Sequence, residues 1–188
     1  KPNYASAYNN LGIALKDLGD LEKAIEAFKK AISLKPDYAT AYSNIGNILK
    51  DQGKLDMAIA SYEKAISLKP DYADAFCNMG VSFKHQGDFD KAIKAYKKAL
   101  FLQPDFAQAH LNYGITLLNR GRIKEGFNEY EWRWKTPDFL SRYRHFSKPM
   151  WDGQMSFNDK ILLLWSEQGI GDTINWSSCL PLVTSRFK

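Results

Sequence analysis

A period of 34 residues dominates this chain of 188 residues and limits the folds that it can adopt. Prolines, two columns of glycine, a column of alanine and a column of aromatic residues all return in register. The prolines and glycines are Pro2, Pro36, Pro70 and Pro104, then Gly12, Gly46, Gly80 and Gly114, then Gly19, Gly53, Gly87 and Gly121. Self-similarity at such a period is the signature of a solenoid, in which each unit buries its apolar face against its neighbours.

The columns predict a pair of helices in each repeat. The second glycines end the first helix in a left-handed turn, and the first glycines remove a side chain where the two helices cross. On the second helix, large and small residues interlock; they are Phe28, Tyr62, Tyr96 and Tyr130, with Ala24, Ala58 and Ala92. We therefore expect first helices near 5–17, 39–51, 73–85 and 107–119. Second helices are expected near 21–33, 55–67, 89–101 and 123–135.

The spacing of aromatic, Leu-Gly, Ala, aromatic, Ala and Pro resembles the tetratricopeptide repeat over roughly residues 3–135. This resemblance implies an all-α fold, a right-handed superhelix of helix pairs with the first helices on its concave side. We expect four repeats in residues 1–135. Because the chain opens at Lys1 in the middle of the pattern, we expect it to be a fragment.

Two details of the repeats carry further expectations. Asp37, Asp71 and Asp105 follow the prolines and are expected to cap the next first helix by accepting its free amides. The fourth repeat departs from the pattern at several columns and then offers Trp132 and Trp134. These tryptophans dock the following segment onto the array, or they stack on a ligand. The departures are His110, Tyr113, Gly126 and Arg133.

One polar column falls on the free face of the first helices and predicts a binding site. It consists of Asn10, Asn44, Asn78 and Asn112, with Asn47 beside it. A side-chain amide donates to a peptide carbonyl and accepts from a peptide N–H, so a ladder of amides can hold an extended backbone. Asparagine is a mediocre helix former, which makes four in register notable. The ladder resembles that of the O-linked N-acetylglucosamine transferases. The alternative is that each asparagine satisfies only local helix groups.

Other ligands are not expected. The columns next to the asparagines hold no basic pair, so a C-terminal carboxylate is not the expected peptide group. The net charge of +5 is spread along the chain rather than gathered on one face, which argues against nucleic acid. Cys77 and Cys179 form no disulfide framework, which favours a reducing, cytoplasmic location. No metal-ligand spacing, cofactor motif or membrane span is recognisable.

The periodicity stops after Lys135. Residues 136–160 contain Pro137, Pro149 and Gly153 and are expected to form an irregular connection. Residues 161–165 are expected to form a buried strand, followed by a glycine loop and a helix from about Thr173, the start of a truncated α/β domain over 161–188. The lone strand would pack on the last repeat or pair with another copy, which gives a possible self-association through 161–188.

This segment is similar to the start of heptosyltransferase-like glycosyltransferases. The residues that carry the resemblance are Gly171-Asp172 and a following helix with Leu180-Pro181. Bacterial proteins that join such a domain to tetratricopeptide repeats also share Trp151-Asp152-Gly153. The resemblance makes Asp172 a candidate general base of a parent enzyme; the alternative is a carboxylate at a helix N-terminus. Because the donor-binding part is missing, this fragment alone is not expected to be an enzyme.

Three functions remain open from the sequence. The first is a scaffold whose asparagine-lined groove holds an extended polypeptide. The second is the N-terminal fragment of a repeat-containing glycosyltransferase with an acceptor-side loop at Asp172. The third is an architectural self-association scaffold. Fold alone does not choose among them.

Overall fold

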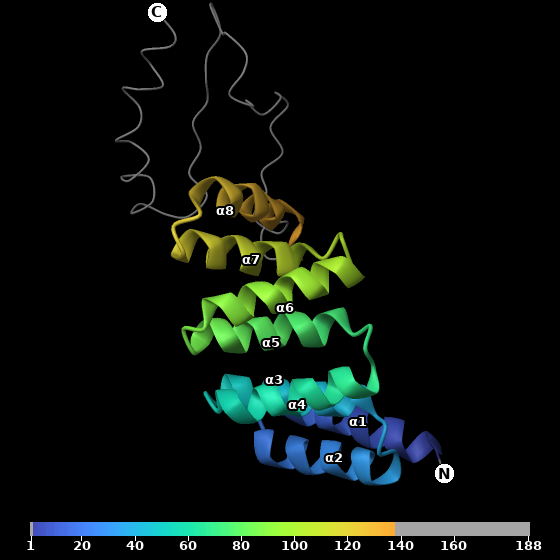
Figure 1. Cartoon of the computed structure of the whole chain (residues 1–188). Coiled ribbons are helices and arrows are strands. Elements are labelled where there is room, and N and C mark those ends of the chain that lie inside the picture. The colour runs from blue at the N-terminus through green and yellow to red at the C-terminus, as the bar shows by residue number, and fades with distance from the viewer. Residues whose placement is uncertain (1, 138–188) are drawn as a thin grey trace, which may run out of the picture. The chain divides into compact units, whose positions relative to one another are not determined.

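The computed structural model describes residues 2–137, with side chains from Tyr4 onward. The chain divides after Thr136 into two units, and the helices of the described residues lie in the first unit. They stack as helix pairs (Figure 1). The elements are α1 (Pro2–Asp17), α2 (Leu21–Leu34), α3 (Ala39–Asp51), α4 (Leu55–Leu68), α5 (Ala73–His85), α6 (Phe89–Leu102), α7 (Ala107–Asn119), α8 (Ile123–Tyr130) and the 3-10 helix η1 (Glu131–Lys135).

The helical repeat expected from the 34-residue period is confirmed. Residues 2–137 contain helices and no strand, and α2 to α7 begin and end within one residue of the expected bounds. The glycine after each first helix has φ between +73° and +83°, the left-handed conformation that the turn requires. The expected strand at 161–165, the loop around Asp172 and the helix from Thr173 lie outside the described residues.

In the first three repeats, each helix pair closes on a glycine that faces an aromatic ring. A Cβ added at Gly46 would lie 2.7 Å from the Tyr62 ring, and one added at Gly80 would lie 2.7 Å from the Tyr96 ring. Both rings are fully buried, as are Ala24, Ala58 and Ala92 of the second helices. The pair therefore packs a ring directly onto the opposite backbone, which any larger residue in place of the glycine would prevent.

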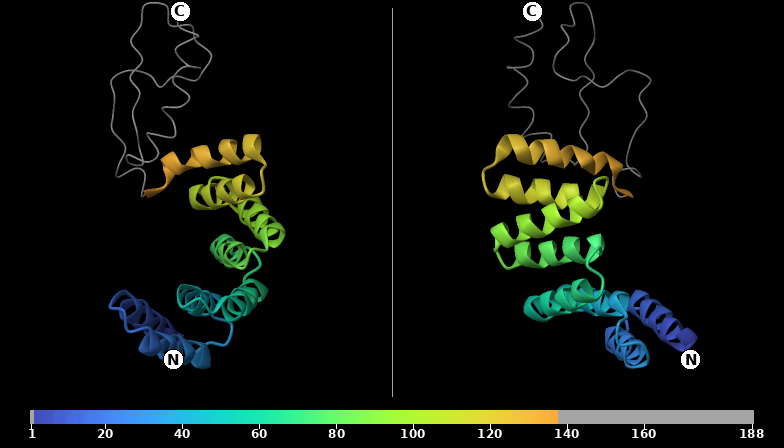
Figure 2. Two further views of the ribbon diagram at one scale, coloured as in Figure 1. Left: turned by 90° about the vertical axis from the view of Figure 1, so that its left-hand side faces the viewer. Right: turned by 45° about the vertical axis from the view of Figure 1, so that its right-hand side comes forward.

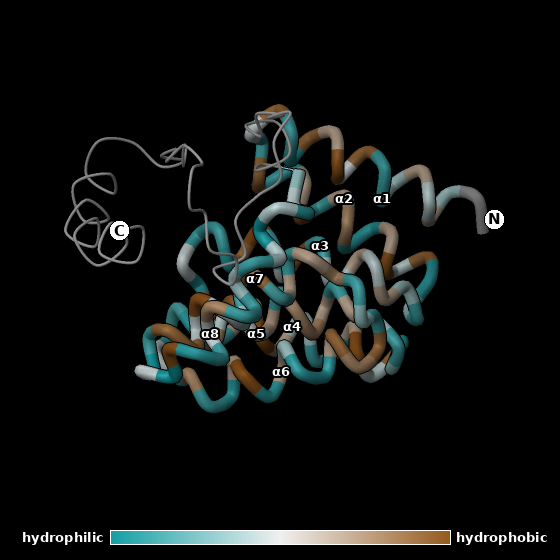
Figure 3. The backbone as a smooth tube through the Cα atoms, turned by 90° about the horizontal axis from the view of Figure 1, so that it is seen from above, coloured by the Kyte–Doolittle hydropathy of each residue, from teal (hydrophilic) through white to brown (hydrophobic). Residues whose placement is uncertain are grey.

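The stack bends with its first helices on the inside. Contacts join α1 to α3, α3 to α5 and α5 to α7, whereas within residues 2–137 no comparable contact joins consecutive second helices. Because the first helices are closer together, they form the inner side of the curve, which Figure 2 shows edge-on. Apolar and polar residues alternate around each helix (Figure 3), and no helix among the described residues could span a membrane.

The expected caps of the first helices are wrong. The N-cap positions of α3, α5 and α7 are Tyr38, Tyr72 and Phe106, and none accepts a hydrogen bond through its side chain. Asp37, Asp71 and Asp105 lie one residue too early to reach the second or third amide of the helix. Side-chain caps occur instead on second helices: Asp20 accepts from the Lys23 amide at 3.3 Å, and Asp88 accepts from the Lys91 amide at 3.1 Å.

The last repeat differs from expectation at its C-terminal end. Helix α8 ends at Tyr130, and residues 131–135 tighten into a 3-10 helix rather than continuing to Lys135 as an α-helix. The two helices of this repeat also approach more closely than in the others. A Cβ at Gly114 would lie 2.7 Å from the backbone nitrogen of Tyr130 rather than against a ring.

Candidate functional site

The asparagine column lies on α1, α3, α5 and α7, the helices on the inner side of the curve. Asn10 is exposed, while Asn44, Asn78 and Asn112 are half-buried. The spacing of one asparagine per repeat thus gives one amide per inner helix. Asn10 and Asn78 have no side-chain hydrogen-bond partner among residues 2–137, so their amides are free to bind a ligand.

Two of the asparagines hydrogen-bond to the preceding inner helix. The Asn44 side-chain nitrogen donates to the side-chain oxygen of Asn9 at 3.1 Å, and the Asn112 nitrogen donates to the Cys77 sulfur at 3.9 Å. Both pairs are 35 residues apart, so they are the same kind of contact at two places in the array. Each amide keeps a second N–H and its own oxygen. These bonds fix the orientation of the amides and leave much of their hydrogen-bonding capacity unused.

Asn47 is engaged by the core of its own repeat. Its side-chain oxygen accepts from the Tyr62 hydroxyl at 2.8 Å, and burial raises the pKa of that hydroxyl well above its usual range. In the third repeat the corresponding residue is Val81, which accepts no hydrogen bond through its side chain, so among the described residues the buried Tyr96 hydroxyl has only Thr116 of α7 nearby. Asn47 therefore orients Tyr62 and offers only its N–H groups to a ligand.

Cys77 lies buried between the asparagines of the third and fourth repeats. Burial raises the pKa of its thiol to about 11, although the bond from Asn112 acts in the opposite direction. At neutral pH the side chain is therefore a neutral thiol that accepts a weak hydrogen bond. Cys77 therefore fills space as a small neutral side chain and is not activated as a nucleophile.

A column of lysines on the inner helices was missed from the sequence. Lys16, Lys50 and Lys84 occupy the same position of three successive inner helices. The charges of Lys50 and Lys84 both act to lower the pKa of the Cys77 thiol, against the larger effect of burial. Burial lowers the pKa of Lys84, and no carboxylate pairs with it within residues 2–137. The 34-residue period would have revealed this column.

The tryptophan region of the last repeat packs on the repeat itself. The Trp132 ring stacks on His110 with centroids 3.9 Å apart and planes 10° apart, and the Lys135 ammonium lies 3.8 Å from the centroid of the Trp132 ring. His110 in turn contacts a Glu129 carboxylate oxygen at 2.5 Å and the Pro104 carbonyl at 2.8 Å. His110 thus replaces the aromatic of the earlier repeats with a hydrogen-bonded ring.

Comparison with known proteins identifies the repeats. A family model described as TPR repeat matches residues 14–53 and 46–87, and a model described as Tetratricopeptide repeat matches residues 73–106. No curated protein matches the sequence.

Solved structures share the fold. The structure titled "Crystal structure of MamA" is 29% identical with a TM-score of 0.64, over 76% of this chain and 84% of that chain. "Crystal structure of MamA protein" is 28% identical with a TM-score of 0.62, over 79% and 81%. "First TPR of Spaghetti (RPAP3) bound to HSP90 peptide SRMEEVD" is 18% identical with a TM-score of 0.61, over 64% and 96%, and bears on the fold alone. Residues 14–106 are therefore tetratricopeptide repeats, and the helical array that contains them is a tetratricopeptide scaffold.

Proposed function

We propose that this scaffold binds an extended polypeptide along its inner face, through the side-chain amides of Asn10, Asn44, Asn78 and Asn112. The observation that carries the proposal is the repeated bond from Asn44 to Asn9 and from Asn112 to Cys77. These bonds hold the amides in one orientation on their helices. An amide whose orientation is already fixed loses less side-chain entropy when it binds a peptide. Each hydrogen bond to the peptide then contributes more to the free energy of binding.

The chemistry of this face favours the peptide backbone over side chains. An amide offers a donor and an acceptor at once, which matches the C=O and N–H groups of an extended chain. Asn47 adds its N–H groups next to the column. A net gain of about 0.5–1.5 kcal/mol for each hydrogen bond predicts binding that grows with the number of repeats engaged and depends little on sequence.

The test uses the full chain and peptides of fixed length. Binding of a fluorescein-labelled peptide of about 15 residues is compared with that of the same peptide with N-methylated backbone amides, because methylation removes the N–H donors. The double variant Asn10→Ala/Asn78→Ala removes two amides that make no internal hydrogen bond. We expect it to weaken binding by about tenfold or more. The control Asn128→Ala removes an exposed amide from the second helix α8.

Binding is measured with peptides of several unrelated sequences, so that the result does not depend on the choice of one ligand. If N-methylated peptides bind as well as unmodified ones, or if Asn10→Ala/Asn78→Ala and Asn128→Ala behave alike, recognition of the backbone by the asparagines is refuted. A solved structure with the same fold holds a peptide, which supports the choice of ligand class for this array.

A second proposal rests on the sequence beyond Lys135. We infer that residues 136–160 connect the array to the start of an α/β domain at 161–188, and that the parent protein is a glycosyltransferase whose acceptor-side loop includes Asp172. The repeats would then position a polypeptide acceptor. Transfer from a panel of nucleotide sugars by the full-length parent, with and without Asp172→Ala, tests this. Turnover that is unchanged by the substitution would exclude Asp172 as the general base.

A further inference from the structure

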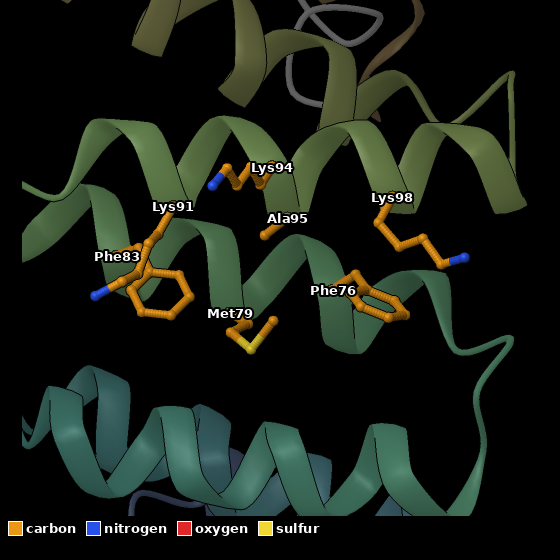
Figure 4. A pocket seen from close by; sticks show the side chains of 7 residues that line it. All are labelled: Phe76, Met79, Phe83, Lys91, Lys94, Ala95 and Lys98. Carbon is orange, nitrogen blue, oxygen red and sulfur yellow. The ribbon is translucent and has the colours of Figure 1, made fainter.

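A second surface of the array has the features of a binding site. It is a hollow of about 220 Å³ where α5 meets α6, with an apolar floor from α5 and a basic rim from α6 (Figure 4). The floor residues are half-buried, while the rim lysines are exposed. The lining consists of Phe76, Met79 and Phe83 on α5, and Lys91, Lys94, Ala95 and Lys98 on α6.

The hollow is separate from the asparagine face. At roughly 100° per residue, the three floor side chains fall within roughly 60° of one another around α5, and Asn78 lies at least roughly 100° away. Phe76 and Phe83 pack against the core of the third repeat, whereas Met79 packs against the core of the second. The floor therefore lies at the junction of two repeats.

The basic rim is particular to the third repeat. Lys91, Lys94 and Lys98 are spaced i, i+3 and i+7, which places them along one face of α6. No other second helix has three lysines at these positions. The equivalent residues are Lys23, Glu26 and Lys30 on α2, Met57, Ala60 and Lys64 on α4, and Glu125, Asn128 and Trp132 in the last repeat.

Two of the rim lysines form no ion pair with the described residues, although the charge of Lys94 helps to lower the pKa of Asp88. Lys91 pairs with Asp88 at 2.8 Å and lies over the Phe83 ring at 5.5 Å. Within residues 2–137, no carboxylate forms an ion pair with Lys94 or Lys98, although Lys98 lies over the exposed Phe101 ring at 5.0 Å. The apolar floor is thus bordered by ammonium groups that donate hydrogen bonds and accept none.

We propose that this hollow binds one large apolar side chain of a polypeptide whose neighbouring residues are Asp or Glu. Small-molecule sites usually enclose about 300–1,000 Å³, so the volume fits a side chain better than a cofactor. Met79 is unbranched and flexible, and it adapts to different apolar shapes. The carboxylates beside the apolar residue pair with Lys94 and Lys98. The inference does not depend on the asparagine face.

The test begins with selection of ligands by the full chain. A random library of peptides of about 12 residues is displayed on phage and panned against immobilised protein, and enriched sequences are synthesised with a fluorescein label. We expect enrichment of a Leu, Met, Phe or Trp flanked by acidic residues. The double variant Lys94→Glu/Lys98→Glu should bind these peptides at least about tenfold more weakly, because reversal of two charges turns attraction into repulsion.

Matched controls come from the neighbouring repeats. Lys30 and Lys64 occupy the position of Lys98 in the first and second repeats, so Lys30→Glu/Lys64→Glu makes the same charge change elsewhere. It should change the affinity by less than about threefold. Asn128→Ala, at the position of Lys94 in the last repeat, should also leave it unchanged. Circular dichroism checks that each variant is folded. Because these lysines are exposed, we expect their substitution to leave the fold intact.

A signal from inside the hollow completes the test. In protein with ¹³C-labelled methionine methyl groups, the Met79 resonance should shift on peptide binding while that of Met57, which is exposed on α4, should not. Three outcomes would overturn the proposal: a selection that yields no peptide sensitive to Lys94→Glu/Lys98→Glu, enriched peptides without acidic residues, or a Met79 methyl resonance that stays in place when they bind.

Discussion

Asn44 on α3 donates a hydrogen bond of 3.1 Å to the side-chain oxygen of Asn9 on α1, and Asn9 is only 4% exposed. A buried amide oxygen without a donor costs more than the bond itself contributes, because the oxygen has lost its water. The pair therefore fastens the first two repeats together on the side of the array proposed to bind peptide. One residue, Asn44, is thus tied to both stability and recognition.

We predict that Asn44→Ala destabilises the array by about 1–3 kcal/mol, because it leaves the Asn9 oxygen buried and unpaired. Asn78→Ala is the matched control, since Asn78 occupies the same column and makes no side-chain hydrogen bond among the described residues. Urea unfolding followed by circular dichroism gives both values. Equal losses for the two variants would show that the Asn44–Asn9 bond contributes nothing to stability.

The contact between Gly80 and the Tyr96 ring gives a second prediction. A methyl group at Gly80 would lie 2.7 Å from the ring, so Gly80→Ala should destabilise the array by about 1–3 kcal/mol through overpacking. In a Tyr96→Leu background the same substitution should cost clearly less, because the ring is gone. The double-mutant cycle is measured by urea unfolding.

Gly87→Ala is the control for that cycle. Gly87 has φ of +82° and nothing within 4 Å of an added Cβ, so its substitution strains the backbone without touching Tyr96. Its cost should be the same in both backgrounds. If Gly80→Ala lowered the free energy of unfolding equally with and without the Tyr96 ring, the prediction would be contradicted. Such a result would mean that the two helices separate without loss of packing.

The sequence predicted the helices well because each boundary depends on a local residue type. Gly53 ends a first helix through its own backbone, and Gly46 admits the Tyr62 ring through its missing side chain. Such effects need no knowledge of distant contacts. The same reasoning failed for Asp37, since a shift of one residue decides whether a carboxylate reaches a helix amide, and spacing alone does not fix that shift.

The candidate site was less predictable because it depends on contacts between repeats. The sequence identified the Asn44 column but not its bond to Asn9, which lies 35 residues away on another helix. Trp132 was expected to meet the following segment or a ligand, and its stacking on His110 requires the 3-10 turn after α8. These relationships arise from how neighbouring helices approach, which residue types do not determine.

Asn47 and Val81 offer a comparison within the chain. Asn47→Val should destabilise the second repeat by about 1–3 kcal/mol, because the buried Tyr62 hydroxyl then loses its acceptor. In a Tyr62→Phe background the substitution should be nearly neutral, since no hydroxyl remains. Thermal unfolding of the four proteins measures the coupling. The third repeat, with Val81 opposite Tyr96, shows that the fold tolerates the apolar residue at this position.

A coupling near zero would contradict that prediction, because it would mean that the Tyr62 hydroxyl gains as much from water as from Asn47. The substitution also separates stability from recognition. Asn47→Val removes N–H donors next to the asparagine column, so peptide binding measured well below the unfolding midpoint reports on recognition alone.

The burial of Cys77 predicts how stability changes with pH. Its thiol has a pKa of about 11 in the folded chain against 9.0 for the free group, so from about pH 9 upward the unfolded chain loses this proton while the folded chain keeps it. The stability that the neutral thiol provides is complete below about pH 9 and is lost as the pH rises toward about 11. Between about pH 9 and 10 the loss should amount to roughly 1 kcal/mol.

Cys77→Ala removes that titration and leaves the other groups in place. The difference in unfolding free energy between the natural chain and the variant should therefore shrink by roughly 1 kcal/mol from about pH 9 to about pH 10. Buried Tyr62 and Tyr96 also titrate at higher pH, but they are present in both proteins and cancel in the difference. A difference that stays constant over this range would mean that Cys77 meets water in the folded chain. The packing of α5 against α7 would then be looser than the hydrogen bond from Asn112 to Cys77 indicates.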